Sequence, residues 1–563
     1  MFKKSTLSLA LTAAIVGVVA TQQAVAMPNA TAANAVPTND PYVNQNGLGQ
    51  ALIFPYYSVR NGLKSFFNIT NTADYAVAVK VRFREGHNSR DALDFNIVLS
   101  PEDVWAGWIE DSATGPVVKT TDNSCVIGAP NIRTTGQALS NVAYGNIVPS
   151  FADQGDNSIE RTREGYVEII GMGKAYAADS GTAGTTAAAG LAYAPVSPQV
   201  GNTAYNATHD ATGAPRNCVI VDSNFVAPAS APQTLPVAFP FNDLGTPQRG
   251  DGDPAAAADF IAFAPGDNPL KGNYSVINAG TGIGAGNAAI AIADFMDTAL
   301  VAATPNGNLI TAQNFPYFLE PSLASREGIW TTQGLADVEV AMTSSTVINE
   351  WANNPSTGAA TDWIITFPTK GFHVDNMVVD ATDVDANGNT TEFMLNTTAG
   401  VNQNIQANNN RWRGLTGNPA VPGYMPAVAP FENNISASGA AVEVSIVGYN
   451  REELGVTAST GNTTPSPFPP GGVTALVLQG EANLVSFSPA GTASALGGEN
   501  FVLNFDISGT LAGNPPNGWA QLGFTGTNAT ANGGLPAVGY AYKSRNQGDA
   551  ALSFGQILGH AWK

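Results

Sequence analysis

Residues 77–84 alternate strictly between two kinds of side chain. The odd positions carry only large apolar residues, namely Val77, Val79, Val81 and Phe83. The even positions carry Ala78 and three cations, namely Lys80, Arg82 and Arg84. Successive side chains of a β-strand point to opposite faces of the sheet. We therefore predict a strand that buries its apolar face in a core and turns its cations towards water.

The same alternation recurs further along the chain. Residues 93–99 repeat it, and turn-forming residues at 71–74 and 100–103 separate the segments. Near the C-terminus, residues 363–367 and 442–446 alternate in the same way. Short alternating segments separated by turns are typical of sandwiches. We predict a mainly β fold with two antiparallel β-sandwich (immunoglobulin-like) lobes, long loop insertions and few short helices.

Composition also disfavours a helical protein. Charged residues make up 12% of the chain, whereas soluble proteins average about 25%. The polar surface must therefore come largely from Asn, Thr, Ser and Gln, which suit strands and turns.

Changes in composition divide the chain into segments. We predict a signal peptide (1–26), a flexible leader (27–45), an N-terminal β-sandwich (46–225) with a low-complexity insertion at about 172–215, a mixed loop-rich middle region (226–350) and a C-terminal β-sandwich (351–563). In the middle region, Ala288 to Met296 and Val338 to Trp351 have apolar spacings that favour helices, although Thr343 to Thr346 weakens the second.

The N-terminus has the form of a secretory signal. Lys3 and Lys4 precede an apolar run from Leu7 to Ala20, and Ala24-Val25-Ala26 has the small-x-small pattern of a cleavage site. The run is shorter than the roughly 20 residues that span a bilayer. We expect cleavage after Ala26, no transmembrane segment thereafter, and a location at the cell surface or outside the cell, with the periplasm as second choice.

The chain is strongly acidic. It has 24 Lys and Arg against 44 Asp and Glu, for a net charge of −20. Loss of Lys3 and Lys4 on cleavage leaves 22 against 44, or −22. Such a surface repels phosphate backbones, so no nucleic-acid partner is expected. It favours solubility, and it also attracts divalent cations.

Cys125 and Cys218 are the two cysteines of the chain. In an exported protein an even pair predicts one disulfide. The bridge would close a loop of roughly 90 residues and would stabilise the fold by about 4 kcal/mol.

Residues 383–389 resemble the start of a calcium loop. Oxygen donors stand at alternate positions, namely Asp383, Asp385, Asn387 and Asn389, and Gly388 occupies the sixth place. The twelfth place, where a bidentate Glu belongs, holds Met394. The other interpretation is a hairpin turn at Asn387-Gly388 between Met377–Val379 and Phe393–Leu395. No cofactor other than this candidate calcium ion is indicated.

Catalytic signatures do not stand out. The four histidines (His87, His209, His373, His560) lack metal-ligand spacing, and we expect them at the surface or in capped turns. Trp105, Trp108 and Trp363 lie in apolar strand patterns and are expected in the core. Trp412, between Arg411 and Arg413, is the candidate for an exposed, ligand-binding aromatic.

Several strings together resemble a known family. They are GQALIFPYYSVRNG (49–62), FREGHNSRDALDFNIVLSPEDVW (83–105), EGYVEII (164–170), TDWIITFPTK (361–370) and YNREE (449–453). They resemble uncharacterised exported or cell-surface proteins of Gram-negative bacteria. The resemblance implies an envelope or extracellular address, and it brings no catalytic residue with it.

These observations lead to one leading hypothesis and two alternatives. The leading hypothesis is a non-catalytic exported cell-surface or secreted structural protein that assembles with itself or with other envelope components into a surface layer or matrix. The first alternative is a glycan- or ligand-binding adhesion module. The second is a polysaccharide hydrolase, which would need two carboxylates about 5–10 Å apart in a cleft.

Overall fold

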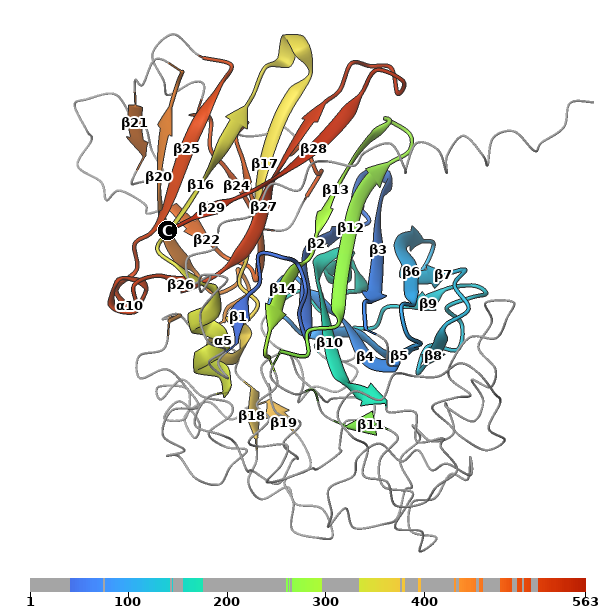
Figure 1. Cartoon of the computed structure of the whole chain (residues 1–563). Helices are drawn as coiled ribbons and strands as arrows, with labels where there is room; N and C mark the ends of the chain where they lie inside the picture. The colour runs from blue at the N-terminus through green and yellow to red at the C-terminus, as the bar shows by residue number, and fades with distance from the viewer. Residues whose placement is uncertain are drawn as a thin grey trace, which may run out of the picture.

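The computed structural model describes residues 41–73, 76–141, 144, 155–175, 260–261, 263, 266–295, 334–374, 377–379, 393–395, 430–431, 435–451, 455–458, 476–488, 494–498, 501–507 and 515–563. The described chain is mainly β, as predicted, and its strands form two sandwich-like lobes (Figure 1). None of the helices in this part of the chain combines the length and apolar character that crossing a bilayer requires.

The N-terminal lobe contains two sheets. Sheet I has the order β1 (Tyr42–Val43), β14 (Ile290–Ala293), β2 (Ala51–Ser58), β10 (Glu164–Ala175), β4 (Ala76–Glu85), β5 (Asp91–Leu99) and β8 (Cys125–Ile127), and β11 (Phe260–Ile261) pairs with β10. Sheet II has the order β13 (Ile283–Ala288), β12 (Leu270–Asn278), β3 (Leu63–Asn71), β6 (Val104–Ser112), β7 (Gly115–Thr120) and β9 (Gln137–Ala138).

The C-terminal lobe also contains two sheets. Sheet III has the order β21 (Gly455–Ala458), β20 (Val442–Tyr449), β25 (Asn517–Phe524), β16 (Thr346–Ala352) and β29 (Ala561–Trp562), and β22 (Leu476–Leu478) pairs with β20. Sheet IV has the order β24 (Val502–Asn504), β23 (Ala482–Ser486), β17 (Ala359–Thr366), β27 (Val538–Arg545) and β28 (Phe554–Gly559). Within it, β23 and β24 are parallel, and the other pairs are antiparallel.

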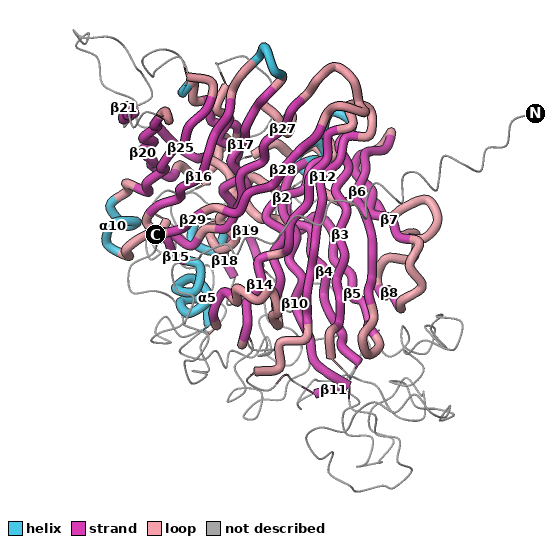
Figure 2. Tube along the Cα trace, turned by 45° about the horizontal axis from the view of Figure 1, so that its top comes forward, coloured by secondary structure: helices cyan, strands magenta, loops and turns pink. Residues whose placement is uncertain are grey.

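Short elements complete the described chain. The helices are α5 (Gly334–Met342), α6 (Gly371–Val374) and α10 (Thr527–Ala531), with 3-10 turns η1 (Arg60–Gly62), η3 (Ile159–Arg163) and η4 (Pro355–Thr357). Two small ribbons pair β15 (Thr343–Ser344) with β26 (Leu535–Pro536), and β18 (Met377–Val379) with β19 (Phe393–Leu395). Figure 2 shows the helices as minor pieces around two adjacent blocks of strands.

The period-two prediction for β4 is confirmed on its apolar face. Val77, Val79, Val81 and Phe83 are at most 1% exposed and lie in the core between sheets I and II. Aromatic rings from both sheets interlock there, with Phe83 and Phe67 centroids 5.8 Å apart and Phe95 and Trp105 centroids 5.9 Å apart. Apolar side chains that leave water in this way supply the main driving force for folding.

Two apolar cores link the lobes. The core of the N-terminal sandwich continues onto Ile364 and Tyr540 of sheet IV, and the Tyr540 ring lies 5.4 Å from that of Tyr274 in sheet II. The core between sheets III and IV takes in Trp363 and continues onto Ile53 of sheet I. Adjacent residues of β17 therefore belong to different cores, and this strand is buried on both faces from Thr361 to Thr366.

The described strands of the predicted middle region before residue 296 pair with strands of the N-terminal lobe. Strand β12 pairs with β3, and β14 pairs with β2, so residues 270–293 complete the two N-terminal sheets. The helix predicted at Ala288 to Met296 is wrong over its described part, because Ile290–Ala293 forms β14. The helix predicted at Val338 to Trp351 is half right: α5 ends at Met342, before the run of threonine and serine, and β16 follows.

Candidate functional site

Parts of three quoted motif segments, from 83–105, 164–170 and 361–370, meet where the two lobes join. Residues 83–90 form the end of β4 and the turn to β5, and residues 161–168 include η3 and the start of β10. From the C-terminal lobe, residues 366–370 and 479–483 pack against them through the contacts given below. Most charged side chains of these segments are buried, so this junction is the first candidate site.

Glu85 organises the turn between β4 and β5. Its carboxylate accepts hydrogen bonds from the backbone N–H groups of His87 at 2.6 Å, Asn88 at 3.0 Å and Arg90 at 2.8 Å. Arg161 donates to the same carboxylate through Nε at 2.6 Å and Nη2 at 2.8 Å. A bidentate guanidinium–carboxylate pair of this kind fixes geometry as well as adding energy.

The cations of β4 form a buried network instead of facing water. Lys80 and Arg82 are 0% exposed and Arg84 is 3% exposed, which corrects the sequence prediction. Arg82 Nε donates to Asp94 at 3.1 Å, and Arg84 Nε donates to Glu168 at 3.0 Å. Buried charges are tolerated only when they are paired, and these pairs come from the adjacent strands β5 and β10.

Hydrogen bonds cross from this turn into the C-terminal lobe. The carbonyl oxygen of Gly86 accepts from the N–H groups of Glu481 at 2.8 Å and Ala482 at 3.1 Å. The Ser89 hydroxyl donates to Glu481 at 3.0 Å and accepts from Tyr166 at 2.7 Å. Ser89 has a left-handed φ of 54°, and these contacts hold it in that uncommon conformation.

Lys370 and Glu481 extend the network on the C-terminal side. Lys370 is 0% exposed and donates to the carbonyl oxygens of Gln479 at 2.9 Å and Gly480 at 2.8 Å. Burial lowers its pKa to about 8, although the charge of Glu481 opposes the shift. Burial likewise raises the pKa of Glu481 to about 8, against the effect of Lys370. Both side chains are 0% exposed, and the hydrogen bond from Ser89 to Glu481 joins this group to the N-terminal lobe.

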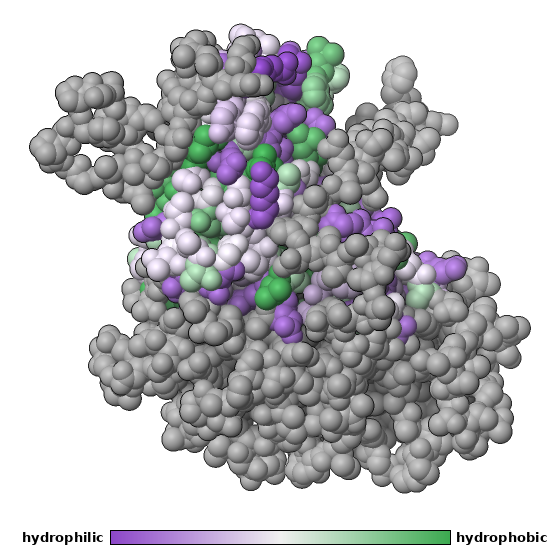
Figure 3. Space-filling view, turned by 60° about the vertical axis from the view of Figure 1, so that its left-hand side comes forward, coloured by the Kyte–Doolittle hydropathy of each residue, from purple (hydrophilic) through white to green (hydrophobic). Residues whose placement is uncertain are grey.

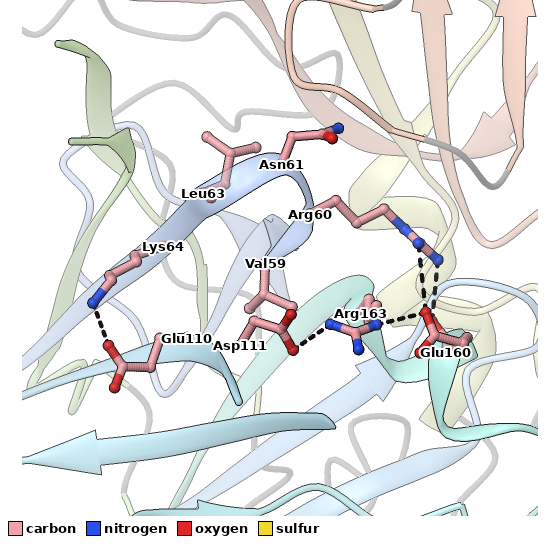
Figure 4. A pocket seen from close by; sticks show the side chains of 10 residues that line it. Val59, Arg60, Asn61, Leu63, Lys64, Glu110, Asp111, Glu160 and Arg163 are labelled. Carbon is pink, nitrogen blue, oxygen red and sulfur yellow. Dashed lines mark hydrogen bonds and ion pairs between the residues drawn. The ribbon is translucent and has the colours of Figure 1, made fainter. Parts of the chain in front are cut away.

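A surface hollow of about 410 Å³ is the second candidate site (Figure 4). Three cations and three carboxylates line it, namely Arg60, Lys64, Arg163, Glu110, Asp111 and Glu160. Figure 4 shows Lys64 directed at Glu110, and Arg163 placed between Asp111 and Glu160. Arg60 also pairs with Glu164, which accepts from the Tyr56 hydroxyl at 2.9 Å. The hollow is therefore electrically balanced.

Glu110, a carboxyl that lines the hollow, does not suit the role of a glycosidase acid. Burial alone would raise the pKa of Glu110, but hydrogen bonds from Lys119 and Lys64 lower it to about 2. A glycosidase acid needs a raised pKa beside an open cleft. Carboxyls with raised pKa do occur in the described residues, at Asp94, Asp362, Glu168 and Glu481. The last three are 0% exposed, and Asp94, with a side chain that is 10% exposed, is held by Arg82.

Of the site residues predicted from the sequence, the structure describes only Cys125. Cys125 is fully buried on β8, and Cys218 lies outside the described residues, so their pairing stays a prediction. Asp383, Asp385, Asn387, Asn389 and Trp412 also lie outside them. The strands predicted to flank the Asn387-Gly388 turn do pair, Met377 with Leu395 and Val379 with Phe393. Within the described ranges, no cluster of three or more His, Cys, Asp or Glu is arranged to hold a metal ion.

The histidine prediction is wrong for His373 and His560, which lie in the interior, while His87 lies in the turn that the Glu85 carboxylate caps, one of the two predicted places. His87, His373 and His560 are at most 5% exposed. The Nε2–H of His560 donates to the Ile364 carbonyl at 3.1 Å, so its Nδ1 accepts from Asn349 at 3.0 Å. Burial lowers the pKa of His560 to about 3, which keeps the ring neutral. His373 contacts Glu339 at 2.6 Å, again inside the C-terminal lobe.

The core assignment is confirmed for Trp105 and Trp363, which are at most 1% exposed. It is wrong for Trp108, which is only partly buried on the opposite face of β6, where its ring stacks on Phe66. Sequence reasoning missed the buried ionic junction. One signal was available: Asp94 lies on the same sheet face as Arg82 once β4 and β5 are folded into a hairpin, because the two residues pair directly in register.

Comparison of the chain with models of protein families, with curated proteins and with solved structures gives no match. The resemblance to exported surface proteins therefore stays a prediction.

Proposed function

We propose that this chain is a non-catalytic, exported structural protein whose two lobes act as one rigid body. One observation carries the proposal. Buried ion pairs of Glu85 with Arg161 and of Arg84 with Glu168 fix the β4–β5 turn inside the N-terminal lobe. Hydrogen bonds from that turn then join the lobes, since Ser89 donates to Glu481 and the Gly86 carbonyl accepts from the Glu481 and Ala482 N–H groups. Groups held in this way position the backbone and are enclosed from any substrate.

The composition of the segments between the described strands supports a role in display. The end of β10, together with β11, β18 and β19, lies at the lower end of the described body in Figure 1. In the sequence, residues 176–259 separate β10 from β11, and this segment is rich in Ala, Gly and Thr. A sandwich body whose strands lead into low-complexity segments suits a component of a surface layer or matrix.

The experiment combines location with assembly. Cells that express the full chain are fractionated into cytoplasm, periplasm, outer membrane and medium, and the purified protein is imaged by negative stain. We expect the mature chain, cleaved after Ala26, at the outer membrane or in the medium, and ordered arrays or polymers in the images. A cytoplasmic chain that retains Lys3 and Lys4 would contradict export, and scattered monomers would contradict assembly.

The state of the cysteines gives an independent check on export. We propose that Cys125 and Cys218 form a disulfide in the mature protein, as expected for a chain that matures in an oxidising compartment. Alkylation before and after reduction, followed by mass spectrometry, should show both thiols blocked only after reduction. Labelling of either thiol without reduction would overturn the disulfide.

A further inference from the structure

Sheet III carries a row of three side chains across its outer face. Trp519 on β25 pairs in register with Tyr449 on β20 and with Glu350 on β16. Adjacent positions on β25 alternate in burial, with Ala520 and Leu522 in the core and Trp519 and Gln521 on the other face. The row therefore faces away from the core between sheets III and IV.

The two aromatic rings form a parallel stack. Their centroids are 4.1 Å apart and their planes differ by 11°. Trp519 is 37% exposed, in contrast to Trp351, which is fully buried one strand away. The indole N–H of Trp351 donates to the Trp519 carbonyl at 3.2 Å, which anchors the strand beneath the stack. A Cβ atom on Gly518 would collide with the Tyr449 carbonyl, so glycine there permits the close approach of the strands.

Both polar and apolar side chains border the stack. In the next register row Gln521 lies between Val447 and Ile348. The Glu350 side chain is 66% exposed and forms an ion pair with Lys543. On the far side of the stack, Tyr449 pairs in register with Gly455. Figure 3 shows this side of the molecule with mostly intermediate hydropathy and scattered hydrophobic residues.

We propose that the Tyr449–Trp519 stack is a binding site for a neutral saccharide chain, an activity beyond the proposed structural role. The apolar face of a sugar ring packs on an exposed aromatic, while its hydroxyls bond to nearby amide and carboxylate groups such as Gln521 and Glu350. The balanced charge of Glu350 with Lys543 fits an uncharged ligand.

A protein partner fits this surface less well. The other large apolar residues that are exposed in the described ranges are Val104, Val340, Leu552 and Phe554. They lie on β6, on α5, before β28 and on β28, so they do not extend the stack into a continuous apolar patch. A stable protein interface buries about 800 Å² on each partner around an apolar centre.

The test is isothermal titration of the full mature chain with four neutral hexasaccharides: cellohexaose, maltohexaose, mannohexaose and N-acetylchitohexaose. We expect at least one to bind, and Trp519→Ala and Tyr449→Ala each to weaken that binding about tenfold or more. Phe554→Ala is the matched control, because it removes an aromatic that is 53% exposed on sheet IV, and it should bind as the wild type does.

Folding of each variant is checked by its thermal transition. If Trp519→Ala does not fold, Trp519→Phe and Glu350→Gln replace it, with a smaller loss expected from each. Failure of all four hexasaccharides to bind the wild type would overturn the proposal. So would equal losses in Phe554→Ala and Trp519→Ala, which indicate nonspecific adsorption, or unchanged binding in the folded stack variants. None of these outcomes bears on export or assembly, which are tested separately.

Discussion

The two faces of sheet I are equally buried around β4 and β10 but are chemically opposite. On one face Val79 and Ile169 are at most 1% exposed within an apolar core. On the other, Arg82 and Glu168 are 0% exposed within a network of ion pairs. Burial is thus achieved by apolar packing on one side and by mutual charge compensation on the other.

This chemical difference determines how a substitution on each face changes the stability of the protein. Loss of an apolar side chain forfeits transfer energy and leaves a cavity. Loss of one partner from a buried ion pair leaves the other charge uncompensated, which costs about 3–5 kcal/mol. The apolar face should therefore tolerate conservative substitutions of single residues. The charged face should tolerate only substitutions that replace both partners of an ion pair together.

The largest effect is expected at Glu85. Glu85→Ala leaves Arg161 without its bidentate partner and three backbone N–H groups without their acceptor. We expect the free energy of unfolding to fall by about 4–5 kcal/mol, at the upper end of the range for broken buried pairs. Urea unfolding measures it. A loss below about 1 kcal/mol would show that the junction does not hold the turn.

On the apolar face the corresponding change is Ile169→Ala. It removes a 1% exposed side chain from the centre of sheet I, so we expect a loss of about 3 kcal/mol in urea unfolding. Ile169→Val is the matched control and should lose only about 1 kcal/mol. Equal losses from the two variants would contradict close packing at this position.

The pH dependence of the free energy of unfolding should distinguish the charged junction from the apolar face of sheet I. Burial raises the pKa of Glu481 to about 8 from 4.5, so the folded state binds its proton more tightly and loses stability as pH rises from about 4.5 to 8. Glu481→Gln removes this titration. Relative to wild type, it should gain at least about 1 kcal/mol over that interval, since one pKa unit equals about 1.4 kcal/mol.

The same pH series on Ile169→Val gives the control, because that substitution touches no titratable group. Its stability difference from wild type should stay constant from pH 4.5 to 8. A Glu481→Gln curve parallel to that of the wild type would show that Glu481 is not held in a low-dielectric junction.

The smallest effect is expected at the surface. Lys64 pairs with Glu110 at the hollow, but its side chain is 46% exposed. Exposed ion pairs contribute about 0–1 kcal/mol, so Lys64→Ala should change the free energy of unfolding by less than about 1 kcal/mol. A larger loss in urea unfolding would mean that burial is not what distinguishes strong pairs from weak ones in this protein.

Local sequence patterns predicted where the strands lie, but they did not predict what packs against each face of a strand. Alternation in residues 77–83 and 442–446 predicted β4 and β20, because period-two burial is a property of a single strand. The fate of Lys80, Arg82 and Arg84 depended on what covers the second face of the sheet. Alternation shows which residues share a face, and it does not show whether that face meets water or protein.

The errors in the middle region have a similar origin. Ile290–Ala293 is a short apolar run whose spacing fits a helix or a strand, and pairing with β2 decides for the strand. The exposed stack on sheet III was also hidden, because Tyr449 and Trp519 are distant in sequence and meet only through the register of β20 and β25. Tertiary partners of this kind leave no local signal.

The central claim is that the junction fuses the lobes into one cooperative unit, and calorimetry of the full mature chain tests it most directly. We predict a single thermal transition whose calorimetric enthalpy equals its van't Hoff enthalpy. Two resolved transitions, with only the N-terminal lobe shifted by Glu85→Ala, would contradict the claim.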